Sequence, residues 1–318
     1  MPTIHQSPPR EPSTTRREPP SRRGRGRIER SQARAGLGFL APFLIVFALV
    51  FIAPLLYAVY LSLFKTQLIG GTAFVGLDNY ARAFADEKLW RGLGRVLLVL
   101  LVQVPIMLAV AVFAALAIDS GRLAGARFYR IGIFLPYAVP GVVAVLMWGF
   151  IYSERYGLTG NVNEVLGAPL LDPLSQAWIL PAIGNILTWE FMGYNMLIFY
   201  SALRTIPSDL YEAAAIDGAG PVRVAWSIKL PALRGALVIA TIFSIIGSFQ
   251  LFNEPNILQT LVPTLISSFF TPNMYAYNLS FVGQQFNYAA TVAIIMGIIT
   301  AVIAYVVQLR GAKEALRS

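Results

Sequence analysis

The chain has 318 residues, of which 56% are hydrophobic and only 13% are charged. Soluble globular domains are typically about 45–50% apolar, so this composition argues against an ordinary soluble enzyme. The chain has no cysteine and one histidine, His5. These counts exclude disulfides, zinc–thiolate sites, iron–sulfur clusters, a histidine metal cluster and a Ser/His/Asp triad within the chain.

A basic tail opens the chain. Residues 1–34 hold nine arginines, three glutamates and six prolines, with almost no large apolar side chains. Such a segment buries too little apolar surface to offset its ordering entropy, so we expect a disordered, Arg/Pro-rich cytoplasmic tail. The arginine run at 22–27 has two interpretations, RNA binding or the positive flank of a membrane helix. We favour the flank, because basic residues beside a membrane span are expected on grounds of orientation alone.

Residues 35–318 are predicted to form a membrane domain. A helical crossing needs about 20 consecutive apolar residues, and six stretches meet this requirement. They are 38–64, 93–118, 129–152, 177–201, 234–253 and 287–309. The fourth is the least uniform, because Asn185, Glu190 and Asn195 lie in its middle. The sequence therefore predicts an all-α integral membrane protein with six transmembrane helices.

The lysines and arginines predict the orientation of these helices. With the tail inside, 19 basic residues lie in the tail and the inner loops and five lie in the outer loops, while Arg95 lies at the outer edge of the second span. Cytoplasmic loops carry an excess of Lys and Arg. We therefore expect both termini to be cytoplasmic.

The predicted cytoplasmic loop at 204–233 has the signals of a helix–turn–helix. Ser208 or Asp209 can cap a first helix, and Glu212 stands three residues after Asp209, as a capping box requires. Gly218 suits the left-handed position that follows a helix.

A second short helix is predicted to begin with Pro221, since proline suits the first helical position, and to end near the membrane at Leu230-Pro231. The loop thus combines acidic, small and apolar residues at fixed spacing. The residues that define this spacing are Glu212, Ala213, Ala214, Gly218, Ile228, Leu230 and Pro231. The pattern resembles the EAA loop of the permease subunits of ABC importers.

Four further segments resemble the carbohydrate-uptake branch of that family. They are 203–207, 210–212, 216–219 and 248–253. They are similar to the first permease of maltose-like and glycerol-phosphate-like importers. The resemblance covers about residues 36–310 and leaves out the tail.

The resemblance implies a type I ABC importer permease fold, in which the chain pairs with a second permease as a heterodimer around the pore. Two cytoplasmic ATPase subunits and an extracytoplasmic sugar-binding protein complete such importers, in the plasma membrane of a bacterium or archaeon. The loop residues named above would then contact the ATPase, with Glu212 meeting a basic residue and Gly218 acting as a hinge. The chain has no G-x-x-x-x-G-K-[S/T] phosphate loop, so it is expected to be no enzyme and to hold no cofactor or metal, with ATP and Mg²⁺ on the partner ATPase.

Polar side chains in the fourth and fifth spans predict a substrate path, because polar groups within a membrane are costly and commonly functional. Glu190 and Tyr194 lie four residues apart on one helical face, and Ser244, Ser248 and Leu251 line a face of the fifth span. When the chain is aligned on Pro207 and Pro231, the resemblance assigns the substrate pocket to nearly the same places. The predicted substrate-path residues are Glu190, Phe191, Tyr194, Ser244, Ser248 and Leu251.

Hydroxyl groups, a carboxylate and aromatic rings suit a sugar, which has both hydrogen-bonding groups and an apolar face. A carboxylate at Glu190 would repel a phosphorylated substrate, which leaves neutral or amino sugars. Three alternatives stay open: a role of the serines in helix packing, pairing of Glu190 with the partner permease, and glycerol-phosphate or an amino acid as the solute.

Two other classes of protein are disfavoured. An intramembrane acid–base enzyme needs paired ionisable groups, and Glu190 is the one such group that the sequence places within the membrane core. A membrane-anchored nucleic-acid binder would rely on the arginine tail, and we expect no nucleic-acid partner.

Overall fold

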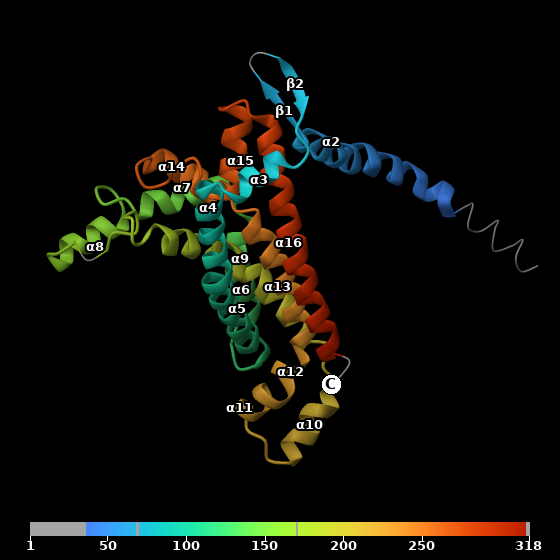
Figure 1. Cartoon of the computed structure of the whole chain (residues 1–318). Helices are drawn as coiled ribbons and strands as arrows, with labels where there is room; N and C mark the ends of the chain where they lie inside the picture. The colour runs from blue at the N-terminus through green and yellow to red at the C-terminus, as the bar shows by residue number, and fades with distance from the viewer. Residues whose placement is uncertain (1–35, 68–69, 170, 316–318) are drawn as a thin grey trace, which may run out of the picture. The chain divides into compact units, whose positions relative to one another are not determined.

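The computed structural model describes residues 36–67, 70–169 and 171–315 (Figure 1). The predicted disordered tail at 1–34 therefore lies outside the described residues. The chain divides into two units, Met1–Tyr57 and Ala58–Ser318. The predicted first span is matched by an apolar helix, Gly36–Ser62, which includes α2 (Ala53–Ser62).

Three π-helical segments of five residues each end two residues before a proline. They are η1 (Ala48–Ile52), η2 (Val99–Gln103) and η4 (Ala225–Lys229), which precede Pro54, Pro105 and Pro231. In each, the residue after the segment donates its backbone N–H to the carbonyl five residues earlier. A proline in a helix clashes with the carbonyl four residues before it. The wider turn moves that carbonyl aside, so the helix continues past the proline.

A small antiparallel hairpin stands near the start of the second unit. It consists of β1 (Phe64–Gln67) and β2 (Gly71–Phe74), with Phe64 paired to Phe74. The prediction of a purely α-helical chain missed it, because strands of four residues are too short to show an alternating pattern. Gly70 and Gly71 have positive φ angles, which glycine adopts without a steric penalty.

The rest of the second unit is helical. Its first part contains α3 (Asp78–Phe84), α4 (Glu87–Leu98), α5 (Val104–Asp119), α6 (Ala126–Phe134), the 3₁₀ turn η3 (Leu135–Ala138), α7 (Gly141–Ile151) and α8 (Leu158–Leu166). Its second part contains α9 (Ile179–Leu203), α10 (Ser208–Ile216), α11 (Pro221–Val224), α12 (Leu230–Ala232), α13 (Arg234–Phe249), α14 (Asn253–Leu261), α15 (Pro272–Phe281) and α16 (Phe286–Ala315).

Two of the predicted spans differ from continuous straight helices. The stretch expected at 129–152 is split at Pro140 into two helical pieces, Ala126–Ala138 and Gly141–Ile151, which meet at 98°. The stretch expected at 234–253 ends at Phe249 and follows Pro221–Ala232 at a bend of 60°.

Three helices in the described part of the chain are long and apolar enough to cross a membrane, or five if each bent pair is one span. The three are Gly36–Ser62, Glu87–Asp119 and Phe286–Gly311. Helix α9 has 25 residues, but its polar middle lowers its hydropathy, as the sequence indicated. The structure is therefore α-helical and rich in apolar helices, and the count of six spans stays a prediction.

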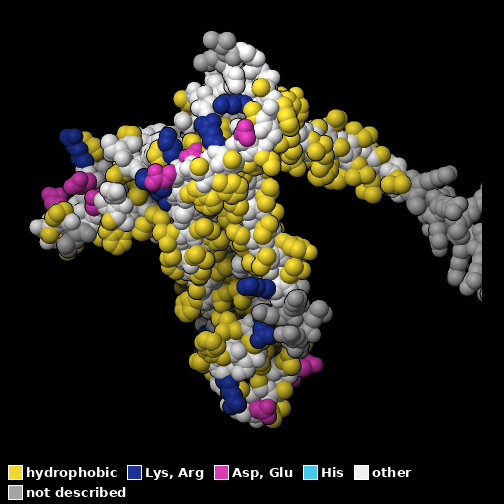
Figure 2. Space-filling model, in the orientation of Figure 1, with side chains coloured by type: hydrophobic (Ala, Val, Ile, Leu, Met, Phe, Trp, Pro, Cys, Tyr) yellow, Lys and Arg dark blue, Asp and Glu magenta, His cyan; other side chains and the backbone are white. Residues whose placement is uncertain are grey.

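In the second unit, α5 packs along α9, and α13 packs along α16 (Figure 1). Apolar side chains of α5, α9 and α13 form one core cluster, which includes Met107, Phe199 and Ala240. Hydrophobic side chains cover the middle of this bundle, and charged side chains gather mainly toward its two ends (Figure 2). The 204–233 loop, with α10 to α12, lies at one end, and α3, α15 and the hairpin lie at the other (Figure 1).

A carboxylate joins three helices at the end that carries α15. Asp86 caps α4 by accepting from the backbone N–H of Lys88, and it accepts hydrogen bonds of 2.6 Å from both Tyr275 and Tyr288. Burial acts to raise the pKa of the Asp86 carboxyl, but these hydrogen bonds outweigh burial and hold the pKa below its usual value. Asp86 therefore stays ionised and ties the start of α4 to α15 and α16.

The close approach of α9 to the end of α6 depends on Gly193, because a Cβ atom there would overlap the carbonyl oxygen of Ile133. We predict that Gly193→Ala forces the two helices apart and destabilises the protein by about 1–3 kcal/mol. Thermal unfolding in detergent measures this effect. Gly94→Ala in α4 is the matched control, since open space surrounds that glycine. Equal melting temperatures for the two variants would contradict the prediction.

Candidate functional site

A cavity of about 380 Å³ lies in the second unit, among α5, α9, α13 and the start of α14. Its wall is mainly aromatic, amide and hydroxyl side chains. The lining residues are Gln103, Val104, Met107, Tyr137, Leu187, Phe191, Tyr194, Asn195, Phe243, Ser244, Gly247, Ser248, Gln250, Leu251, Asn253 and Glu254. Side chains spaced three or four residues apart on α9 and α13 face the cavity together, because this spacing returns to one face of a helix.

Five of the six predicted substrate-path residues line this cavity. They are Phe191, Tyr194, Ser244, Ser248 and Leu251. The sixth, Glu190, is not among the lining residues. Its Oε1 instead lies beside Gly141, the first residue of α7. The N-terminus of a helix favours a negative charge, which accounts for this position.

Glu190 is nevertheless an unusual group. The residue is 8% exposed, and its Oε2 has no hydrogen-bond partner among the described residues. It is close enough to Glu254 for the two carboxylates to interact electrostatically.

Glu254 lines the cavity, although it lies just beyond the predicted fifth span at 234–253. It lies in the first turn of α14 and is 8% exposed. Burial raises the pKa of its carboxyl, and a hydrogen bond from its own backbone N–H partly opposes that rise. Within the described chain, Glu254 is the one carboxylate on the cavity wall, and no basic side chain lines it. The sequence feature that could have identified Glu254 is its position directly after the 248–253 segment.

An aromatic group forms one side of the cavity. The rings of Tyr137 and Tyr194 stack with their centroids 4.9 Å apart, and Phe191 meets Tyr137 edge-on at 6.1 Å. Tyr137 comes from η3, so the break in the 126–151 stretch brings this ring to α9. Tyr137 is not among the predicted substrate-path residues, because no local sequence pattern relates it to α9.

The polar groups of the wall are partly occupied by contacts within the protein. Ser248 Oγ donates to the carbonyl of Ser244 at 2.8 Å, and the Asn195 amide donates to the carbonyl of Phe191 at 3.0 Å. The Gln103 amide donates to Thr188 Oγ1 at 3.2 Å. These side chains are therefore held in place, and each has an oxygen that can accept further hydrogen bonds.

The 204–233 loop forms the predicted helix–turn–helix, with one correction. Helix α10 begins at Ser208 after Pro207, and no side chain caps it. The predicted capping box is therefore wrong: Ser208 and Asp209 already lie inside the helix, and Ser208 Oγ instead contacts Asp209 Oδ1 at 3.4 Å. Glu212 is exposed.

The turn after α10 is built on Gly218, which has a φ of +71°, so the predicted left-handed conformation is confirmed. Ala219 N–H donates to the carbonyl of Ala214, and Gly218 N–H donates to that of Ala215. This pair of bonds is a Schellman motif, which satisfies the last carbonyls of a helix. Pro221 is the first residue of α11, as predicted.

The described part of the loop exposes apolar side chains. The exposed set is Leu210, Ile216, Val222 and Trp226, and Trp226 is 70% exposed. Exposed groups of large apolar residues commonly mark protein–protein contacts.

Comparisons with known proteins agree with this architecture. Residues 87–310 match the family model "Binding-protein-dependent transport system inner membrane component". The diacetylchitobiose uptake system permease protein NgcF of Streptomyces coelicolor is 31% identical, over 93% of this chain and 88% of its own length. The sn-glycerol-3-phosphate transport system permease protein UgpA of Escherichia coli O157:H7 is 34% identical, over 66% of this chain and 71% of its own length.

The fold is also known from a solved structure. A chain in the crystal structure of a bacterial ABC transporter involved in the import of the acidic polysaccharide alginate superposes with a TM-score of 0.75 at 17% identity, covering 90% of this chain and 99% of that chain. The chain described here belongs to the family of binding-protein-dependent transport system inner membrane components.

Gly218 provides a test of the turn. We predict that Gly218→Val strains the left-handed position by about 1–2 kcal/mol and speeds amide hydrogen exchange across residues 208–217 by about 5–30-fold. Mass spectrometry of peptides from the exchanged protein measures this change. Gly220→Val is the matched control, because Gly220 has an ordinary φ of −70° and open space around it. Similar exchange in both variants would refute the role of Gly218 in the turn.

Proposed function

We propose that the chain is the permease subunit of an ATP-driven sugar importer and forms half of its translocation pore. The observation that carries this proposal is the cavity between α5, α9 and α13, with its stacked aromatic rings and its amide and hydroxyl groups. A sugar offers hydroxyl groups to the polar side chains and an apolar face to the rings. Similarity to a diacetylchitobiose permease supports the same substrate class.

The membrane arrangement that we propose has six spans and both termini in the cytoplasm of a bacterium or archaeon. The apolar middle of the bundle and its charged ends support it (Figure 2). Helix α9 is the proposed span with the polar middle, and its neighbours contact those polar groups. Asn195 lies against Met107 of α5, Glu190 lies beside Gly141 of α7, and Asn185 donates to the hydroxyl of Tyr152, which follows α7.

The 204–233 loop is the proposed contact with a cytoplasmic ATPase. Its exposed apolar residues and the exposed Glu212 support this role. The proposed contact residues are Glu212, Ala213, Ala214, Gly218, Ile228, Leu230 and Pro231. ATP and Mg²⁺ would bind to the ATPase, and a second permease and a sugar-binding protein would complete the importer.

The charge of the cavity favours neutral or amino sugars. Within the described residues its wall carries Glu254 and no lysine or arginine, so an anion would enter without a counter-charge. This favours a sugar over glycerol-phosphate, the substrate that the name of the relative UgpA gives.

The importer itself can be tested by purifying the tagged chain from its native membrane in mild detergent. We expect a second permease and an ATPase to copurify, and the sugar-loaded binding protein to stimulate ATP hydrolysis. Recovery of the chain alone, with no ATPase after crosslinking in intact membranes, would contradict the proposal.

The stacked rings of Tyr137 and Tyr194 predict that transport falls when one of these side chains is shortened to alanine. Tyr194→Ala removes a stacking surface, and we expect sugar uptake to fall about 3–10-fold. Uptake of labelled diacetylchitobiose into proteoliposomes is the measurement. Tyr305→Ala on the exposed face of α16 is the control, and equal uptake by both variants would remove Tyr194 from the substrate path.

We expect different effects on sugar uptake when each of the two buried carboxylates, Glu254 and Glu190, is neutralised. Glu254→Gln changes the charge of the cavity wall, so we expect altered uptake, whereas Glu190→Gln should leave uptake near the unmodified level. The same proteoliposome assay compares the two variants. The reverse order of effects would place Glu190, and not Glu254, in contact with the substrate.

A further inference from the structure

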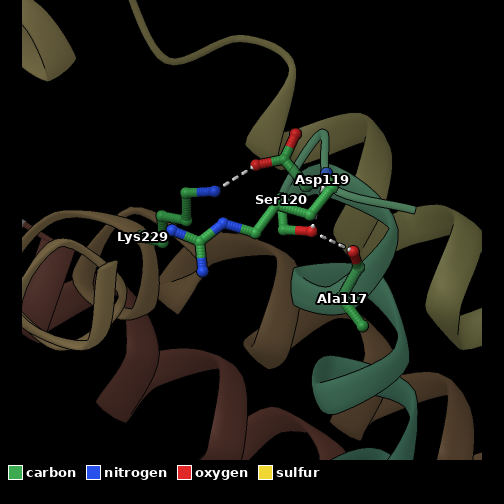
Figure 3. A network of polar contacts seen from close by, with 5 residues as sticks. Ala117, Asp119, Ser120 and Lys229 are labelled. Carbon is green, nitrogen blue, oxygen red and sulfur yellow. Dashed lines mark hydrogen bonds and ion pairs between the residues drawn. The ribbon is translucent and has the colours of Figure 1, made fainter. Parts of the chain in front are cut away.

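A largely buried ion pair joins two segments that are 110 residues apart in the sequence. Lys229 Nζ donates to Asp119 Oδ2 at 2.5 Å, and the side chains are only 13% and 9% exposed (Figure 3). Asp119 is the last residue of α5, and Lys229 is the last residue of η4, in the 204–233 loop. In the turn that follows α5, Ser120 Oγ donates to the carbonyl of Ala117 (Figure 3).

This pair differs from the other ion pair that the described residues contain. Glu87 and Arg91 also meet at 2.5 Å, but on one helix and with more than half of each side chain exposed. A buried ion pair adds little net stability, since desolvation offsets the attraction, but it penalises any arrangement in which its partners separate. The Asp119–Lys229 pair therefore serves to hold the loop to α5 in one arrangement.

Tyr211 extends the contact to α10. The ammonium group of Lys229 lies 5.5 Å from the centroid of the Tyr211 ring, within the range of a cation–π interaction. Burial raises the pKa of the Tyr211 hydroxyl, the negative charge of Asp119 adds to the rise, and Arg204 opposes it. Lys229 thus contacts α10 through Tyr211 and α5 through Asp119.

Both segments held by this pair continue to the cavity. Helix α5 carries the lining residue Met107, twelve positions before Asp119 and so about 18 Å along a helix. Lys229 leads through α12 into α13, which carries the lining residue Ser244. A displacement of α10 can therefore reach two walls of the cavity, through the contacts of Lys229 with Tyr211 and Asp119 and then along α5 and α13.

We infer that Asp119, Lys229 and Tyr211 form the linkage that transmits movement of α10 to α5 and α13. These are positioning residues, and the inference rests on the proposed function, in which α10 contacts the ATPase. The Tyr211 ring couples α10 to Lys229, and the ion pair couples Lys229 to α5, so that a movement driven by ATP hydrolysis reaches the cavity.

The test measures sugar imported per ATP hydrolysed by the complete importer in proteoliposomes. Asp119→Asn and Lys229→Met should keep ATP hydrolysis and lower this ratio about fivefold or more, the lower end of typical couplings between sites. The double exchange Asp119→Lys with Lys229→Asp should restore at least part of it. Glu87→Gln is the matched control, which removes a carboxylate from an exposed ion pair of the same length. If uptake and hydrolysis fall together in the single variants, the pair serves folding alone and the inference is wrong.

Two substitutions of Tyr211 distinguish the role of its ring from the role of its hydroxyl group. We expect Tyr211→Phe to keep the ratio of uptake to hydrolysis, since the ring remains, and Tyr211→Ala to lower it. A normal ratio in Tyr211→Ala would remove α10 from the linkage.

A distance measurement on the same complex does not depend on transport. Because the chain has no cysteine, spin labels can be placed at Arg122→Cys and Ala215→Cys without background from this subunit. We expect Asp119→Asn to broaden the distance distribution between α10 and the end of α5, and the charge exchange to narrow it again. An unchanged distribution would overturn the linkage, whereas an unmodified complex without sugar-stimulated hydrolysis would instead overturn the proposed function.

Discussion

The structure depends on one constraint: a helix in apolar surroundings must keep its backbone hydrogen-bonded even where a proline interrupts the pattern. The chain meets this constraint with a wide π turn before Pro54, Pro105 and Pro231, in which the bond to the carbonyl five residues back replaces the ordinary one. Two of these turns end at a residue that belongs to the cavity or to the Asp119–Lys229 ion pair. Gln103 lines the cavity, and Lys229 forms the buried ion pair. The π turns thus preserve the helices past the prolines.

The cavity results from a second local interruption, the break at Pro140. Because the two parts of this stretch meet at 98°, the short η3 turn presents Tyr137 to α9, where it stacks on Tyr194. The N-terminus of α7 then lies beside Glu190 and accounts for that carboxylate without a ligand. The end of α13 at Phe249 lets the chain turn so that Glu254 reaches the cavity wall. Two carboxylates of similar burial therefore have different surroundings, and one of them faces the cavity.

The loop and the cavity lie at different levels of the same helices. Helix α5 has Met107 at the cavity and Asp119 at the ion pair, and α13 follows directly from the segment that carries Lys229. The side chains of α5, α9 and α13 share one core cluster. A movement of the loop therefore either meets resistance from all three helices or displaces them together. This arrangement gives a physical basis for the proposed coupling between an ATPase contact and a substrate path.

The sequence by itself determined the features that depend on local chemistry. Apolar stretches predicted the long helices, Gly218 predicted a left-handed turn, Pro221 predicted a helix start, and the spacing around Glu212 predicted the family to which the chain belongs. Five of the six residues assigned to the substrate path line one cavity, because helical spacing brings them to common faces. The tertiary structure alone decided which carboxylate faces the cavity, how Tyr137 reaches α9, and that Asp119 meets Lys229. These outcomes depend on contacts between segments far apart in the chain, for which neither hydropathy nor spacing carries a signal.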